Sequence, residues 1–142
     1  MDEKTLRSII EGVIKEFTEG SGKAATAVAT APSVVGTAGE LKISEAGAAE
    51  RGTNPREVVI ALAPGFGGRM VNTIVGIPHA DAIKELCAGI EEQGLTYRFI
   101  RVFRTADVGF IAHEAAKLSG SGIGIGIQSR GTTVIHQKDL PP

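Results

Sequence analysis

The sequence predicts a three-layer α/β domain with a mostly parallel sheet and one antiparallel edge strand. From residue 56 onward, apolar runs typical of buried strands alternate with amphipathic segments of helical spacing. The last two predicted strands follow one another closely, separated only by a short polar turn. Strands that alternate with helices usually form a parallel sheet covered on both faces, and a terminal hairpin adds one antiparallel strand.

The first 18 residues are predicted to form an amphipathic helix that stands apart from the domain. Apolar side chains recur there at helical spacing, at positions 6, 9, 10, 13, 14 and 17. Residues 19–55 are rich in Ala, Gly, Ser and Thr, lack such a stripe, and are predicted to be a flexible linker. An isolated helix this short is marginal in water. We therefore expect it to dock on a partner, with folding back onto the domain as the alternative.

The domain itself is predicted to span residues 56–142. Its first element is the continuous apolar run 57–64, which is typical of a buried strand. A helix follows from Pro78 to Gly94, because proline suits a first turn and glycine a helix end. Residues 96–103 then form the second strand.

The second half of the domain repeats the alternation of helix and strand. Thr105 or Asp107 can cap a further helix, which Gly120 closes. Residues 122–127 and 132–136 are predicted strands of the final hairpin. In sheets of this kind, ligands bind outside the carboxyl ends of the strands.

Glycine occupies four alternate positions near the start of this hairpin: Gly120, Gly122, Gly124 and Gly126. Because strand side chains alternate between faces, one face would be almost bare backbone. Such a face suits either a broad ligand or the tight packing of a helix against the sheet. The residues alone leave both interpretations open.

Composition excludes several classes of function. The net charge of −1 provides no basic field for nucleic acid, so we expect no such partner. No segment approaches about 18 uninterrupted apolar residues and no secretory signal is apparent, which predicts a cytoplasmic protein without a membrane span. The single cysteine, Cys87, cannot form an internal disulfide and is expected to be a small core residue.

Catalytic motifs are scarce. The loop Pro64–Gly68 suggests dinucleotide binding, but the third glycine of G-x-G-x-x-G would fall at Met70. The histidines His79, His113 and His136 lie on separate elements, where capped or surface roles are expected. We predict no catalytic and no metal-binding residue. This inventory favours a subunit that binds or assembles over an independent enzyme.

From Glu57 to Pro142 the chain resembles the medium (beta) subunit of adenosylcobalamin-dependent diol and glycerol dehydratases. The resemblance lies in EVVIALAPGFG, VNTIVGIPHADAIKELCAGIEEQGL and RFIRVFRTADVGFIAHEAAKLSGSGIGIGIQSRGTTVIHQKDLPP. The extension before it resembles that of the propanediol-type medium subunit, which directs the enzyme into bacterial microcompartments. This implies a location inside such a compartment and a shell protein as a partner for residues 1–18.

The resemblance implies a Rossmann-like domain that holds adenosylcobalamin against a large catalytic subunit, with a small subunit as a further partner. Such enzymes convert 1,2-diols or glycerol to an aldehyde and water through a radical rearrangement. The chain would thus be a non-catalytic subunit of a hydro-lyase, inactive alone. The resemblance does not choose between propanediol and glycerol, because the substrate is held by the large subunit.

Three cofactor-binding residues follow from the resemblance: Asp107, Val108 and Arg130. The first two match the family's Asp-Val pair, and Arg130 stands where the family has a cobalamin-contacting lysine. Guanidinium and ammonium differ in reach and geometry, so that contact is expected to change. A glycine-lined surface would also fit the broad, flat corrin ring, because backbone can approach it closely.

Two alternatives of other classes accompany this interpretation. The chain could be a non-catalytic interaction or encapsulation module of a microcompartment, or the small subunit of a dehydratase-reactivating factor. The family's medium subunit also continues beyond the segment that matches Leu140–Pro142. We therefore expect this chain to be shortened at its carboxyl end and to assemble less tightly with the large subunit.

Overall fold

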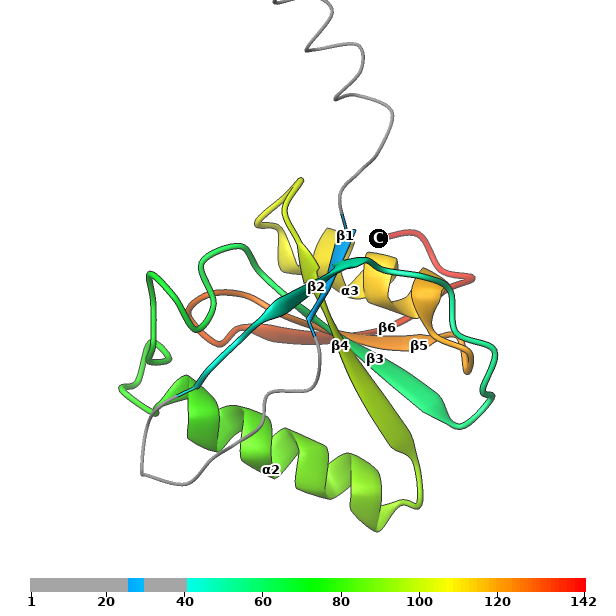
Figure 1. The fold of residues 1–142 in the computed structure, drawn as a ribbon, viewed down its shortest axis with the longest axis horizontal. Coiled ribbons are helices and arrows are strands. Elements are labelled where there is room, and N and C mark those ends of the chain that lie inside the picture. Colours follow the sequence, from blue (N-terminus) through cyan, green and yellow to red (C-terminus); the bar gives the residue numbers. More distant parts are fainter. Residues whose placement is uncertain (1–25, 30–40) are drawn as a thin grey trace, which may run out of the picture.

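One six-stranded sheet forms the centre of the computed structural model, which describes residues 26–29 and 41–142 (Figure 1). The strand order is β2-β1-β4-β3-β5-β6. The strands are β1 (Thr26–Ala29), β2 (Glu45–Ala48), β3 (Glu57–Leu62), β4 (Thr96–Val102), β5 (Ile123–Ile127) and β6 (Thr133–Gln137). The described helices are α2 (His79–Glu92) and α3 (Val108–Leu118).

The predicted α/β fold class is confirmed by the centre of this sheet. β3 pairs in parallel with β4 on one side and with β5 on the other. β6 returns antiparallel to β5 as the predicted edge strand, through the tight turn that leads from Gln128 to Thr132. The four central and carboxyl-terminal strands and both helices lie within a residue or two of their predicted bounds.

The two helices cover opposite faces of the sheet and complete the three layers (Figure 1). β3 shows the alternation most clearly, because Val58, Ile60 and Leu62 join the core on the α2 side while Val59 and Ala61 join the core on the α3 side. The helices contribute Ile83, Cys87 and Ile90 from α2 and Ile111 and Ala115 from α3. Cys87 is buried, as expected of a core residue.

The glycines of β5 let the backbone of α3 approach the sheet. A Cβ atom on Gly126 would lie 2.5 Å from the backbone nitrogen of Ala112 and 2.8 Å from its Cα. A Cβ atom on Gly124 would collide with the backbone of Ala115 and Ala116. Of the two interpretations left open by the sequence, the tight packing of a helix is therefore confirmed at these positions.

The remaining two glycines of the run also have structural neighbours. A Cβ atom on Gly120 would collide with the backbone of Asn54, and Gly122 has a φ of +79° and lies against the side chain of Lys138. The glycine stripe is thus covered by the chain's own residues. The expectation that it forms a flat surface for the corrin ring is wrong.

The prediction of a flexible linker over residues 19–55 also needs correction. β1 pairs antiparallel with β4, and β2 pairs antiparallel with β1, so both strands extend the sheet. Leu41 and Ile43 pack on the core beside α2, and Ala49 packs on the core beside α3. Neither strand carries an apolar stripe that the sequence could reveal, because each is only four residues long.

The predicted helix of residues 1–18 lies outside the described residues. Within the described ranges, no helix is long and apolar enough to cross a membrane.

We predict that Gly126→Ala lowers the free energy of unfolding by about 1–3 kcal/mol, because the added methyl group overpacks the contact between α3 and β5. Gly89→Ala is the matched control: Gly89 is exposed within α2, and a Cβ atom there meets nothing within 4 Å. Removing a helical glycine should stabilise the protein by up to about 1 kcal/mol. Urea unfolding of both variants measures the difference, and equal stability of the two would contradict this packing.

Candidate functional site

The carboxyl ends of β4, β3 and β5 meet at one edge of the sheet, where three connections leave it. They are the loop 63–78 after β3, the segment 103–107 before α3 and the turn 128–132 after β5. Because β3 lies between β4 and β5, its loop separates the other two connections. This edge carries all three residues for which a cofactor contact is expected.

Arg101 fixes the start of the loop after β3 from inside the protein. Its side chain is buried on β4, and Nη1 donates hydrogen bonds of 3.0 Å to the carbonyl oxygens of Ala63, Pro64 and Phe66. Burial lowers the pKa of Arg101, while the charge of Glu45 on β2 acts in the opposite direction. The carboxylate of Glu45 lies 3.4 Å from Nε. The loop therefore leaves the sheet in one defined conformation.

A buried aromatic stack holds the two ends of the same loop together. The rings of Phe66 and His79 are parallel, with centroids 3.8 Å apart. Nδ1 of His79 accepts a hydrogen bond of 3.1 Å from the backbone N–H of Gly67. The proton of the neutral ring is therefore on Nε2, which is buried and has no hydrogen bond of normal geometry within the described part of the chain.

Burial lowers the pKa of His79, and the backbone groups of Ser129, Asn72 and Met70 only partly oppose this effect. The ring is thus held neutral in the folded protein. The expectation of a capped or surface role is wrong for His79, because its side chain is buried.

Asp107 begins α3. Oδ1 accepts hydrogen bonds from the backbone N–H groups of Gly109 at 2.9 Å and Phe110 at 3.3 Å, so Asp107 is the N-cap. Of the two predicted caps, Thr105 instead accepts from the N–H of Asp107 through Oγ1. Asp107 is exposed and Val108 half-buried. No described residue donates a hydrogen bond to Oδ2 of Asp107.

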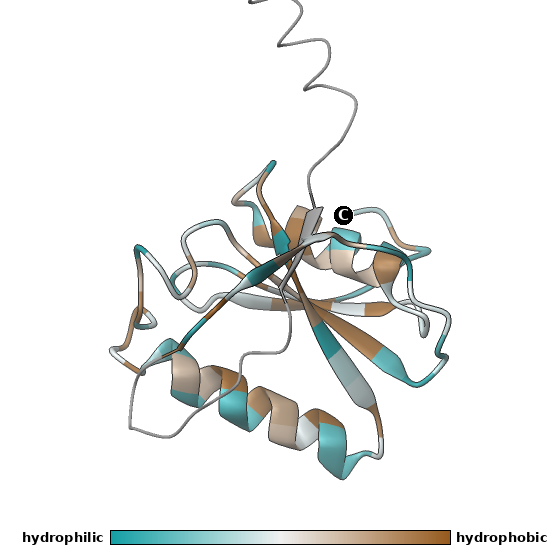
Figure 2. Cartoon of the chain, viewed as in Figure 1, coloured by the Kyte–Doolittle hydropathy of each residue, from teal (hydrophilic) through white to brown (hydrophobic). Residues whose placement is uncertain are grey.

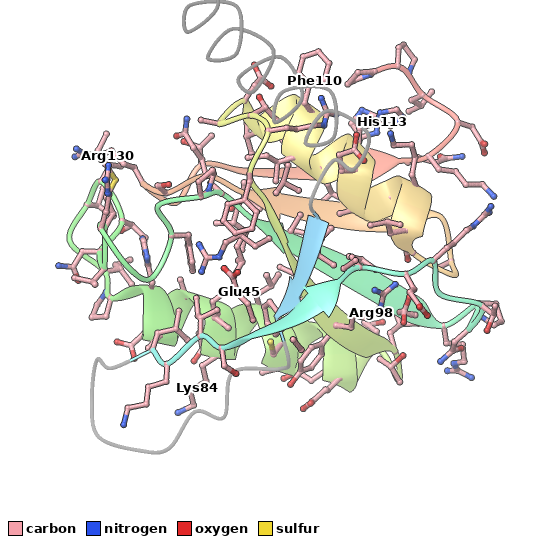
Figure 3. The ribbon with its side chains drawn as sticks, turned by 45° about the horizontal axis from the view of Figure 1, so that its top comes forward. Glu45, Lys84, Arg98, Phe110, His113 and Arg130 are labelled. Atoms are coloured by element: carbon pink, nitrogen blue, oxygen red, sulfur yellow. The ribbon has the colours of Figure 1, made fainter. Side chains whose placement is uncertain are left out.

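Arg130 lies at the tip of the turn after β5, where Figure 3 shows its side chain at the periphery of the molecule. The turn is closed by hydrogen bonds from Gln128 N–H to Thr132 O and from Gly131 N–H to Gln128 O, both of 2.8 Å. The carbonyl oxygen of Arg130 accepts from the N–H of Ile74 at 2.9 Å. Its guanidinium group makes no ion pair or hydrogen bond with the described residues.

The structure brings Asp107, Val108 and Arg130 to one edge of the sheet. Asp107 and Val108 make no direct contact with Arg130. Asp107 and Arg130 are both exposed residues. An acceptor and a donor of this kind suit a ligand fringed with amides. The described residues contain no cluster of three or more His, Cys, Asp or Glu side chains that could hold a metal ion.

Sequence reasoning missed the two buried polar residues behind this edge, Arg101 and His79. A signal for Arg101 was available, because it interrupts the apolar strand FIRVF, and buried arginines need several acceptors. No comparable signal marks His79. Its burial depends on Phe66, thirteen residues earlier, which only the folded loop brings against the imidazole ring.

Comparisons with known proteins show the family to which the chain belongs. A family model described as dehydratase medium subunit matches residues 63–142. Among solved structures, a chain named glycerol dehydratase reactivase is similar to this chain at 29% identity, with a TM-score of 0.47. That match covers 58% of this chain, which spans 64% of the length of the solved chain.

We predict that acidification destabilises the protein through His79. Because the pKa of His79 is lowered in the folded state, the unfolded state binds the proton more tightly. The contribution of His79 is complete above the ordinary value of 6.5 and is lost as the pH falls below it. Glu114 titrates below this window, since hydrogen bonds from Lys117 and Arg104 outweigh its burial and lower its pKa.

Thermal unfolding between pH 7.5 and pH 5.5 measures this effect. The His79→Gln variant should lose part of the pH dependence of the parent over this interval, whatever its stability at neutral pH. The control is His113→Gln at a half-buried histidine on α3. An unchanged pH dependence in His79→Gln would show that the buried ring is not responsible.

Proposed function

Because this chain belongs to the dehydratase medium subunit family, we propose that it holds adenosylcobalamin against the large subunit of a diol or glycerol dehydratase. The proposal rests on the family match over residues 63–142. The proposal includes the large and small subunits as partners of this chain, adenosylcobalamin as the cofactor, and a diol or glycerol as the substrate of the complex. The chain's own role is that of a non-catalytic subunit of a hydro-lyase.

The carboxyl edge of the sheet offers the groups that such a role requires. Corrin carries a fringe of amides, which need both hydrogen-bond donors and acceptors. Arg130 provides an exposed guanidinium donor, and Asp107 provides a carboxylate oxygen that α3 does not use. Val108 adds an apolar contact next to Asp107. The covered glycine stripe is not part of this site.

The chain's residues bind and orient, and the described residues suggest no acid–base pair at this edge. Arg101 holds the loop after β3, and the cap at Asp107 fixes one carboxylate oxygen. When bound, adenosylcobalamin supplies the radical with which such enzymes convert a 1,2-diol or glycerol to an aldehyde and water. The groups that handle substrate belong, in this proposal, to the large subunit.

We predict that Arg130→Gln weakens cobalamin retention by about tenfold or more, because a charge-assisted hydrogen bond is worth about 1.5–3 kcal/mol. Arg130→Lys keeps the charge and should retain more of the cofactor. Asp107→Asn should also retain less cobalamin, although asparagine preserves the N-cap. Asp107→Ala would remove the N-cap together with the carboxylate. The fold of each variant is checked by thermal unfolding.

The experiment mixes each variant with the large and small subunits of a diol dehydratase and follows bound cobalamin by absorbance after gel filtration. Lys138→Gln, an exposed charge at the start of the carboxyl-terminal segment, is the control for a general loss of charge. The site assignment fails if Arg130→Gln and Asp107→Asn both retain cobalamin like the parent.

Residues 1–18 are proposed to direct the protein into a bacterial microcompartment by docking on a shell protein. The support is the amphipathic spacing of the sequence, with apolar residues at positions 6, 9, 10, 13, 14 and 17. We predict that residues 1–20 fused to a fluorescent protein form foci in cells that produce shells. Replacing Ile10 and Ile14 by Glu should make the fluorescence diffuse, and diffuse fluorescence of the unaltered fusion would refute the proposal.

A further inference from the structure

The loop between β3 and α2 carries an unusual concentration of exposed apolar side chains. Nine large apolar side chains are exposed among the described residues, and five of them lie between residues 70 and 77. Ile74 and Val75 at its tip are 72% and 75% exposed, and Met70, Val71 and Ile77 accompany them. Figure 2 shows brown segments along this loop, outside the core. We call residues 70–77 the apolar loop.

The apolar loop is held in shape by its own hydrogen bonds. Thr73 donates its N–H to the carbonyl oxygen of Ile77 at 2.8 Å and accepts from the N–H of Gly76 at 3.0 Å. Oγ1 of Thr73 also accepts from the N–H of Ile77 at 3.1 Å. These bonds close a turn that presents Ile74 and Val75 outward. A loop that is already ordered loses little entropy when a partner binds.

Backbone hydrogen bonds attach the apolar loop to neighbouring segments of the same edge. The N–H of Ile74 donates to Arg130 O at 2.9 Å, and the N–H of His79 donates to Val71 O at 2.8 Å. A Cβ atom on Gly131 would lie 2.8 Å from Thr73 Cγ2, so the turn after β5 packs directly on the loop. The apolar loop is thus continuous with the turn that carries Arg130.

Two arginine side chains border the apolar loop. Arg69 and Arg130 are both exposed beside it, while the nearest acidic residue along the chain after the loop, Asp81, belongs to the first turn of α2. A symmetric contact between two copies of the loop would bring like-charged rims together, which is unfavourable. The surface therefore fits a different partner, with an apolar pocket and an acidic rim.

We propose that the apolar loop anchors this chain to the large dehydratase subunit, with Ile74 and Val75 inserted into an apolar pocket bordered by acidic side chains. The inference rests on the proposed function and adds the surface that carries the assembly. Exposed apolar patches of this kind usually mark protein interfaces, and a few central side chains carry most of the binding energy. The loop lies beside Arg130, so docking there would place the proposed cofactor contact at the subunit boundary.

The test measures association of the full chain with purified large and small dehydratase subunits in the absence of cobalamin. The double variant Ile74→Gln/Val75→Gln should bind about tenfold or more weakly than the parent. Ile135→Gln is the matched control, because Ile135 is 71% exposed but lies on β6, outside the apolar loop. Both variants should unfold at the temperature of the parent to within a few degrees, since the replaced side chains are exposed.

The outcomes separate this inference from the proposed function. If the parent binds and the double variant binds equally well, the apolar loop is not the anchor, whereas loss of cobalamin retention in Arg130→Gln would still support the proposed function. If the parent does not bind the subunits at all, both proposals fail. Self-association of the chain, or binding to anionic phospholipid vesicles, that the double variant abolishes would assign the loop to another partner and overturn the inference.

Discussion

The close approach of α3 to β5 is the contact on which the rest of the structure depends. Gly124 and Gly126 have no side chain that would keep the two elements apart. On the helix, Ala112 and Ala115 face them with only a methyl group each. This contact fixes α3 along β5 and β3, so the amino-terminal end of the helix lies at the carboxyl edge of the sheet. Asp107 lies at this edge because β4 ends there, and the packed helix that it caps holds its side chain in place.

Behind the same edge, the protein uses a buried charge where an apolar side chain would be easier to accommodate. Arg101 donates hydrogen bonds to three backbone carbonyl groups as the chain turns away from β3. Removing a guanidinium from water is costly unless several acceptors and a counter-charge compensate. The arrangement suggests that a defined loop at this edge matters more to the protein than the extra stability of an apolar interior.

The sequence was sufficient for the regular elements of the domain, because long apolar runs and clear helix ends mark them. It was insufficient where a structure depends on pairing between distant segments. β1 joins the sheet by pairing with β4 and β2 by pairing with β1, and nothing in their own short sequences indicates these pairings. The glycine run illustrates the same limit: its periodicity identified a close approach, but the helix that makes the approach could only be identified in the fold. Asp107 and Arg130 were assigned as cofactor contacts from the family resemblance, whereas their separation by the loop after β3 required the strand order.

The contact between Glu45 and Arg101 has a practical consequence for where this polypeptide can be divided. A cut at residue 55, which composition favours, would detach the only carboxylate that lies against the buried guanidinium within the described residues. It would also remove Leu41 and Ile43 from the core beside α2. A fusion that carries the amino-terminal segment on another protein should therefore end well before these residues, which belong to the α/β domain.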